Sequence, residues 1–358
     1  MSQKIVLIEP NPTGHRLMYV RLIIQEASAR GASVTLVLHE DRYQDPAVET
    51  HLASVAGQFA LRVTGDFTLE AVAALTHEYG ADITIVPDGD NCAINIARRG
   101  SWQGRGQLRV LVMRTDSPPT RIPGIRWLRS RIKWMLLNRA NEVDRVQIVL
   151  LASAVSSSRP TKSRFAVAHD PVEMSATDED AARFRSAANM ERERYWFGVL
   201  GAITPRKNLP MVARAILTAG PTDVGLLIAG VCDVATLTKS ISALDRIRKS
   251  RGQVVVINRL LTENELDAAV RVTDCIILAH SNEGPSGLFG KAMAVGTRVI
   301  AAGSRSLRED VSFVGANASW CELSAKALGN EMSLSKSRKR PDPFPMPNPA
   351  GFARALIG

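Results

Sequence analysis

Short apolar segments alternate with helical segments along almost the entire chain, and this alternation restricts the possible folds more than any other feature. The apolar runs of the first half have the length and composition of strands covered on both faces, and they are KIVLIE, SVTLVL, ADITIVP, LRVLVM and VQIVLLAS. Residues 16–31, 68–80 and 91–100 lie between these runs and have helical periodicity. The order strand, helix, strand predicts an α/β fold with a parallel sheet.

The pattern starts again in the second half, after a polar and charged stretch at residues 175–194. The strand-like runs there are YWFGVLG, VGLLIAG, QVVVIN, DCIILAH and TRVIAA. We therefore expect two Rossmann-like domains, residues 1–175 and 176–340, and a Pro-rich tail, residues 341–358, that packs back toward the first domain. Such sheets bind ligands at the carboxyl ends of their strands, so the expected site is a cleft between the domains.

Composition excludes several classes of protein. With 358 residues and 45% hydrophobic content, the chain is long and apolar enough for two folded domains. The first apolar run ends at Glu9, too early for an export signal, and no run reaches the roughly 18 residues of a membrane span. The four cysteines are widely spaced, without a C-x-x-C pair, which favours reduced thiols in the cytoplasm over a zinc or disulfide scaffold.

Three glycine-containing loops each follow a predicted strand and precede a helix. They are EPNPTGH with Gly14 and His15, GAITPRK with Gly201, Arg206 and Lys207, and SNEGPSGLFGK from Ser281 to Lys291. Glycines let backbone amides approach an anion, cations near a helix start suit a diphosphate, and Glu283 can accept hydrogen bonds from sugar hydroxyls. None of the loops is a dinucleotide fingerprint or a Walker loop. An ordinary surface turn is the alternative interpretation of each.

Taken together, GAITPRKNLPMVARAIL and SNEGPSGLFGKAMAVGTRVIAAG resemble the nucleotide-sugar-binding half of GT-B glycosyltransferases, and retaining glycosyltransferase family 4 in particular. The element order matches over most of the chain, and the motifs are most specific between residues 201 and 303. The resemblance implies that Lys207 and Arg206 stabilise the donor diphosphate and that Glu283 lies at the transferred sugar. The further donor-binding candidates are Gly14, His15, Gly201, Gly284, Ser286, Gly287, Leu288 and Lys291.

Two positions depart from the family's pattern. Ala202 stands where the family often has an arginine, and Arg206 can supply that charge from a shifted position. Lys291 replaces the second glutamate of the Glu-x7-Glu motif, which in the family holds the nucleotide ribose, and an ammonium donates hydrogen bonds but accepts none. Three alternatives stay open: Lys291 contacts donor oxygens, it points away while another residue holds the ribose, or the chain is an inactive relative.

Acidic and basic residues that follow strands of the first half are candidates for the acceptor side. Asp88 and Asp90 follow one predicted strand, and Arg114 and Asp116 follow the next. Residues at the carboxyl ends of strands can face the ligand site. Turn residues without any such role are the alternative.

Residues 124–141 predict a basic helix. The net charge is +10, and residues 98–139 contain eleven Lys or Arg and one acid, a balance of +10. Ile125, Leu128, Ile132, Met135 and Leu136 share one stripe, which is expected to face the core. Tryptophans and cations on the other faces then suit an anionic membrane, and these are Trp127, Trp134, Arg126, Arg129 and Lys133. A solvated helix whose tryptophans pack under a neighbouring loop is the alternative. The sequence has neither zinc-finger spacing nor an RNP-like aromatic strand, which argues against nucleic-acid binding.

The sequence and the resemblance lead to one main hypothesis. We expect a retaining, hexosyltransferase-type enzyme that moves a sugar from a UDP- or GDP-sugar to a glycan or lipid-linked acceptor in polysaccharide or glycoconjugate assembly. It is expected to need neither a cofactor nor a metal, and to contact the inner face of the membrane peripherally. A non-catalytic partner subunit and a nucleotide-sugar epimerase with the same fold are the alternatives. The oligomeric state is left open.

Overall fold

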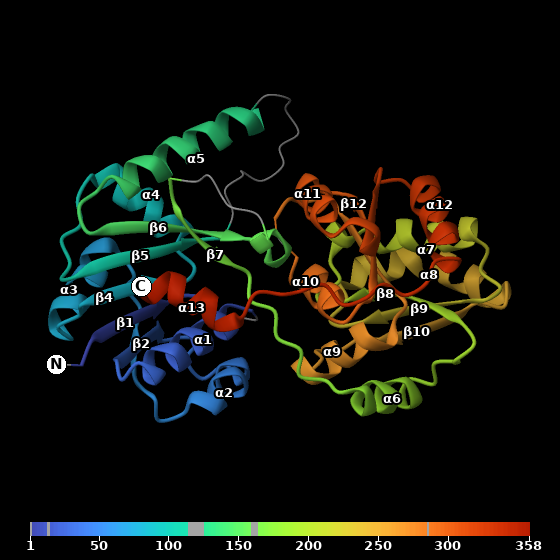
Figure 1. The fold of residues 1–358 in the computed structure, drawn as a ribbon, viewed down its shortest axis with the longest axis horizontal. Coiled ribbons are helices and arrows are strands. Elements are labelled where there is room, and N and C mark those ends of the chain that lie inside the picture. Colours follow the sequence, from blue (N-terminus) through green and yellow to red (C-terminus); the bar gives the residue numbers. More distant parts are fainter. Residues whose placement is uncertain (1, 13–14, 114–124, 159–163, 285) are drawn as a thin grey trace. The chain divides into compact units, whose positions relative to one another are not determined.

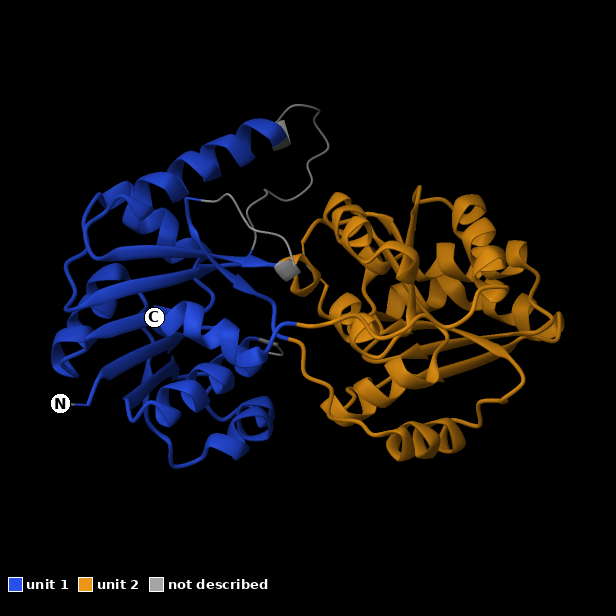
Figure 2. Cartoon of the chain, in the orientation of Figure 1, with its two compact units in different colours: residues 1–152, 159–171, 347–358 blue, residues 153–158, 172–346 orange. Residues whose placement is uncertain are grey.

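The computed structural model describes residues 2–12, 15–113, 125–158, 164–284 and 286–358. The chain divides into two compact units (Figure 2). Unit 1 comprises residues 1–152, 159–171 and 347–358, and unit 2 comprises residues 153–158 and 172–346. The end of the chain therefore returns to the unit in which the chain begins.

Unit 1 is built on a seven-stranded sheet whose strand pairs are all parallel, in the order β3-β2-β1-β4-β5-β6-β7 (Figure 1). Its strands are β1 Lys4–Glu9, β2 Ser33–His39, β3 Phe59–Thr64, β4 Ile83–Val86, β5 Gln107–Val112, β6 Val146–Ala152 and β7 Ala166–His169. Its helices are α1 His15–Ala29, α2 Pro46–Leu52, α3 Leu69–Glu78, α4 Asp90–Arg99, α5 Ile125–Asn141 and α13 Pro349–Ile357, with a 3-10 turn at Ala53–Val55.

Unit 2 has a six-stranded sheet, also with parallel pairs throughout, in the order β10-β9-β8-β11-β12-β13. Its strands are β8 Tyr195–Leu200, β9 Val224–Ala229, β10 Gln253–Ile257, β11 Cys275–His280, β12 Arg298–Gly303 and β13 Ala318–Cys321. Its helices are α6 Asp178–Ala187, α7 Leu209–Ala219, α8 Val234–Lys249, α9 Glu263–Val272, α10 Gly287–Ala294, α11 Arg305–Val314 and α12 Ala325–Lys336, with 3-10 turns η2 Ala154–Ser158, η3 Pro205–Lys207 and η4 Gly315–Asn317.

Both sheets are covered by helices on both faces. Along β1, Ile5 and Leu7 contribute to one buried cluster while Val6 and Ile8 contribute to another. Successive strand residues point to opposite faces, so both faces of this strand are apolar. The same alternation along β8 feeds two clusters in unit 2. The prediction of two Rossmann-like parallel-sheet halves is confirmed.

Helix α5 corrects one expectation. The predicted core stripe is wrong for Leu128, Ile132 and Met135, which are 52%, 44% and 62% exposed. The helix is instead anchored by Leu137 and Ala140 near its carboxyl end, both fully buried in the cluster of α4 and β6 residues. Leu128, Ile132 and Met135 therefore remain partly in solvent.

Candidate functional site

Lys207 is a buried cation at the carboxyl end of β8. The 3-10 turn η3 carries it, and its side chain is only 5% exposed. The ammonium Nζ donates to the backbone carbonyl of Leu200, the last residue of β8. Asn208, the next residue, has a left-handed backbone and donates from Nδ2 to the carbonyl of Ala279 in β11 at 2.9 Å. These contacts fix the cation between two neighbouring strands.

Gly201 lies beside the ammonium of Lys207. Its φ of +77° favours glycine, and a Cβ at this position would lie 3.5 Å from Nζ of Lys207. The same Cβ position is 3.8 Å from Cδ1 of Leu288, in the first turn of α10. The structure therefore brings together Gly201, Lys207 and Leu288, three residues that the sequence selected in two separate motifs.

Electrostatically, the carboxyl ends of β8 and β11 form a positive site. Burial, and then the nearby Arg206, lowers the pKa of Lys207 to about 8. His280, the last residue of β11, was not selected from the sequence, and burial together with Lys207 and Arg206 lowers its pKa to about 3. A polar residue that closes an apolar strand at its carboxyl end is the signal that would have found His280.

Glu283 is held by the amino-terminal end of α11. Its Oε2 accepts hydrogen bonds from the Ser304 hydroxyl at 3.0 Å and from the amides of Arg305 and Ser306 at 2.9 and 3.1 Å. Helix amino termini favour negative charge. Gly284 follows with φ of +128° and donates from its amide to the Ser306 hydroxyl at 3.0 Å. The loop that carries Glu283 is thus fixed in one orientation by α11.

The start of α10 is the third part of this site. Its N-cap residue Ser286 makes no side-chain cap hydrogen bond, and Gly287 is exposed. Backbone amides at a helix start are ready donors for an anion. Residue 285 lies outside the described residues.

Lys291 is paired with acids of α9. Its Nζ lies 2.5 Å from Oδ1 of Asp267 and 3.5 Å from Oε2 of Glu263, and it donates to the carbonyl of Glu173 at 2.9 Å. Asp267 is 1% exposed and also accepts from the amide and hydroxyl of Ser175 at 2.7 and 3.0 Å. Lys291 therefore joins α10, α9 and the segment around residues 173–175.

In unit 1, a buried acid and a partly exposed acid lie at the carboxyl ends of β1 and β4. Glu9 is fully buried, its Oε1 accepts from the amide of Asn11 at 2.9 Å, and its Oε2 has no hydrogen-bond partner in the described parts of the chain. Asp88 forms an ion pair with Arg16 at 2.9 Å. Burial, with a smaller contribution from Asp88, raises the pKa of Glu9 to about 8, so Glu9 is neutral at pH 7.

One acceptor-side candidate contacts one membrane candidate in the structure. Asp90 starts α4, accepts from the amide of Met113 at 3.2 Å and forms an ion pair with Lys133 of α5. This pair links one residue predicted for the acceptor with one predicted for the membrane. Gly14, Arg114 and Asp116 lie outside the described residues, as do the side chains of His15 and Arg126.

The exposed part of α5 is both apolar and basic. Trp127 is 62% exposed, and the guanidinium of Arg131 lies 4.8 Å from its ring centre. Trp134 is 37% exposed and its ring centre lies 5.6 Å from that of Phe165. Arg129 is exposed beside them. Both tryptophans thus contact other side chains while part of each ring stays in solvent.

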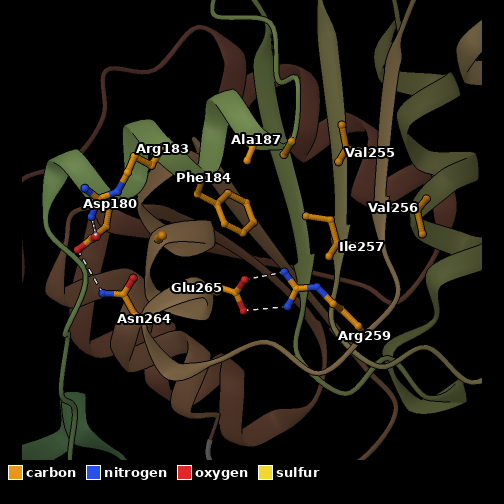
Figure 3. A pocket seen from close by; sticks show the side chains of 12 residues that line it. Asp180, Arg183, Phe184, Ala187, Val255, Val256, Ile257, Arg259, Asn264 and Glu265 are labelled. Atoms are coloured by element: carbon orange, nitrogen blue, oxygen red, sulfur yellow. Dashed lines mark hydrogen bonds and ion pairs between the residues drawn. The ribbon is translucent and has the colours of Figure 1, made fainter.

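A cavity of about 550 Å³ lies among α6, α9 and the edge strand β10 of unit 2 (Figure 3). Phe184, Val255 and Ile257 give it an apolar lining. The four charged residues of its lining are paired or hydrogen-bonded, as Arg183 with Asp180 and Arg259 with Glu265. The cavity therefore presents no charged group in need of a partner.

The described residues contain no group of three or more His, Cys, Asp or Glu side chains able to hold a metal ion. Among the same residues, no helix is sufficiently long and apolar to cross a bilayer.

Comparison of the whole chain with known proteins gives structural matches only. No protein-family model and no curated protein matches the sequence. HepE of Anabaena, solved in complex with UDP and glucose, superposes with a TM-score of 0.69 at 15% identity, covering 99% of this chain and 94% of that one. Sucrose-phosphate synthase from Thermosynechococcus elongatus gives 0.64 at 15% identity, with 99% and 94% covered.

A putative UDP-N-acetylglucosamine 2-epimerase from Listeria monocytogenes is similar too, with a TM-score of 0.58 at 11% identity over 100% of this chain and 94% of that one. At such identities the similarity establishes the fold. The two-domain GT-B fold expected from the sequence is therefore confirmed over nearly the whole chain.

Proposed function

We propose that this chain is a glycosyltransferase that moves a sugar from a nucleotide-sugar donor, UDP- or GDP-linked, to a glycan or lipid-linked acceptor. The observation that carries the proposal is the buried ammonium of Lys207, placed beside Gly201 and the start of α10. A cation next to exposed helix amides suits a diphosphate. The structural similarity to HepE, which was solved with UDP and glucose, supports the same ligand class.

The proposed chemistry is transfer with retention of the anomeric configuration. The bond between the anomeric carbon and the diphosphate oxygen breaks while the acceptor hydroxyl oxygen bonds to that carbon on the same face, and the hydroxyl proton passes to the departing diphosphate. Lys207 and Arg206 stabilise the negative charge that develops on the diphosphate, because cations fixed in advance do not reorganise during the reaction. Glu283 lies at the transferred sugar. With its carboxylate oriented by α11, it can accept further hydrogen bonds from the sugar hydroxyls.

Of the three alternatives for Lys291, its contacts favour the second. The ammonium is engaged by Asp267 and by the Glu173 carbonyl. We therefore propose that Lys291 has a structural role and that another residue holds the nucleotide ribose. On this proposal the chain keeps its donor site even though the second glutamate of the family motif is missing.

Binding and turnover test the proposal. Calorimetry with UDP, GDP, ADP and dTDP should give binding of at least one nucleotide, and no binding of any of them would exclude a donor site. NMR of the product's anomeric proton decides between retention and inversion. Conversion of the donor sugar without any acceptor would instead establish an epimerase, the alternative favoured by the Listeria structure. Nucleotide binding without turnover of any donor would favour a partner subunit.

We also propose that α5 contacts the inner face of an anionic membrane. Five large apolar residues of this helix are more than a third exposed, and they are Trp127, Leu128, Ile132, Trp134 and Met135. Indole rings and basic residues together suit the headgroup region. Lys133 pairs with Asp90 and is not assigned to this surface, whereas Arg129 and Arg131 are.

Vesicle co-sedimentation tests the membrane contact. Trp127→Ser with Met135→Ser should reduce binding to vesicles that contain phosphatidylglycerol, while nucleotide affinity stays the same. Leu260→Ser is the control, because it removes a 78% exposed apolar side chain elsewhere. Absence of vesicle binding by the parent protein would refute the contact, and concentration-dependent dimerisation lost in the double variant would assign the surface to a second copy.

A further inference from the structure

His280 is a buried histidine whose ring is incompletely satisfied. It is 7% exposed, and its Nε2 has no hydrogen-bond partner among the residues that the structure describes. Buried polar atoms are nearly always hydrogen-bonded in native proteins, and an exception calls for a specific cause. A ligand that occupies the site is one such cause.

The position of His280 indicates what kind of ligand this is. It ends β11, and the following residue, Ser281, donates from its amide to the carbonyl of Arg206 at 3.0 Å. The turn η3, which carries Arg206 and Lys207, is therefore fixed against the end of β11. Both cations act electrostatically on the imidazole, and together with burial they keep it neutral. A neutral imidazole has one donor and one acceptor nitrogen.

Among the described residues, no acid neutralises the ammonium of Lys207. Within the described part of the chain, no carboxylate forms an ion pair with Lys207, and burial raises the pKa of the nearby Cys232 thiol, which therefore stays neutral. The neighbouring Arg206 repels it. Glu283, in the loop after β11, is directed to the amino terminus of α11 by three hydrogen bonds. The charge of Lys207 is therefore left for an anionic ligand to neutralise.

We propose that His280 is a second contact for the diphosphate of the donor, donating a hydrogen bond from Nε2 to a phosphate oxygen beside Lys207. This inference rests on the proposed function, since it concerns the same donor site. It adds a neutral donor to the two cations, and it explains why a polar ring is kept at the end of an otherwise apolar buried strand.

The proposed contact predicts different effects of a His280 substitution on thermal stability and on ligand binding. Replacing His280 with Leu removes an unsatisfied polar group from a buried position, so the unliganded protein should keep or raise its thermal midpoint. Ligand binding should weaken in the same variant, because a hydrogen bond to a charged group is lost. A histidine with a purely structural role would lower the midpoint when removed.

The experiment compares the full-length parent protein with His280→Leu and His280→Gln by calorimetry and thermal melting. Inorganic pyrophosphate, UDP and uridine are the probes. We expect His280→Leu to bind pyrophosphate and UDP about tenfold or more weakly, with uridine binding unchanged. His280→Gln keeps an N–H donor and should recover most of the affinity.

The outcomes separate this inference from the proposed function. Unchanged pyrophosphate and UDP affinity in His280→Leu, or an equal loss for uridine, overturns the contact while leaving the donor site in place. A fall in the unliganded midpoint without rescue by His280→Gln also overturns it. Pyrophosphate binding that His280→Leu weakens, in a parent that binds none of UDP, GDP, ADP and dTDP, supports the contact but rejects the proposed function. If the parent binds neither pyrophosphate nor any of UDP, GDP, ADP and dTDP, both the contact and the proposed function are overturned.

Discussion

Glu9→Gln should stabilise unit 1 increasingly as the pH rises from 5 to 8. Glu9 is fully buried at the end of β1, and burial raises its pKa from 4.5 to about 8. The folded protein therefore holds a proton on Glu9 that the unfolded chain releases above pH 4.5. The favourable contribution of the neutral acid is complete below pH 4.5 and is lost progressively as the pH approaches 8.

The magnitude follows from the displacement of the pKa. Each pH unit between the unfolded and folded values corresponds to about 1.4 kcal/mol. Because pH 7 lies 2.5 pH units above the unfolded pKa of 4.5 and still below the folded pKa, the free energy of unfolding of the parent at pH 7 is about 3 kcal/mol lower than at low pH. Glutamine has a similar shape and stays neutral, so the free energy of unfolding of the variant does not fall in this way. The difference in unfolding free energy between the variant and the parent therefore grows with pH.

Urea unfolding at pH 5, 6, 7 and 8 measures this difference. Pulse hydrogen exchange of peptides from β1 and β2 reports unit 1 separately from unit 2, which matters because a two-domain chain need not unfold in one step. Glu49→Gln, which changes an exposed acid of the same unit, is the control and should give no pH-dependent difference. Parallel stability curves for the parent and Glu9→Gln would refute the reasoning, since Glu9 would then titrate alike in the folded and unfolded states.

Three further predictions concern unit 2. Lys207→Ala should weaken UDP much more than uridine in calorimetry, by about tenfold or more, and equal losses would place Lys207 away from the diphosphate. UDP affinity of the parent should decrease as the pH rises through about 8, because Lys207 loses its proton there, and Lys207→Arg should flatten this profile between pH 7 and 9. Lys291→Glu should lower the urea stability of unit 2 by about 3 kcal/mol or more, since it places a second acid beside buried Asp267, and an unchanged transition would contradict the buried pair.

The central strands of both sheets were predictable from the sequence, and three edge strands were not. β3, β7 and β13 each lie at an edge of their sheet. β3 is mostly exposed, so its sequence FALRVT lacks the continuous apolar character of a strand buried on both faces. β7 and β13 are only four residues long, and most of their residues are partly exposed. A run of apolar residues identifies a strand only where the strand is buried on both faces, and the strands at a sheet edge are the least buried.

The parts of the candidate site that depend on a local backbone conformation were predictable from sequence motifs. Gly201 and the loop from Glu283 to Leu288 could be selected because a glycine between a strand and a helix indicates a backbone conformation or a close approach that a side chain would hinder. Glu9 and His280 were missed because each is a single polar residue at the end of an apolar run. Their significance depends on burial and on neighbours that are distant in sequence, such as Asp88 for Glu9 and Lys207 for His280.

The exposure of the aliphatic stripe of α5 was missed for a related reason. A helical stripe of aliphatic residues predicts burial only if another element covers it, and periodicity does not reveal whether such an element exists. Leu137 and Ala140, which anchor the helix, lie outside the expected stripe. The apolar residues left in solvent strengthen the case for a membrane contact, because they add to the area supplied by the tryptophans.

Lys291 illustrates how a motif position can change sign without leaving an unpaired charge. A glutamate at this position would face the buried carboxylate of Asp267, and two like charges in a site from which water is largely excluded repel strongly. The lysine and the aspartate are therefore interdependent in this chain, and the aspartate is additionally held by Ser175. Removing one partner alone leaves the other as an unpaired buried charge. Because the pair ties α10 to α9 and to the segment entering unit 2, the position fixes the helix that begins at the proposed phosphate site, and the recognition of the ribose must be sought in other residues.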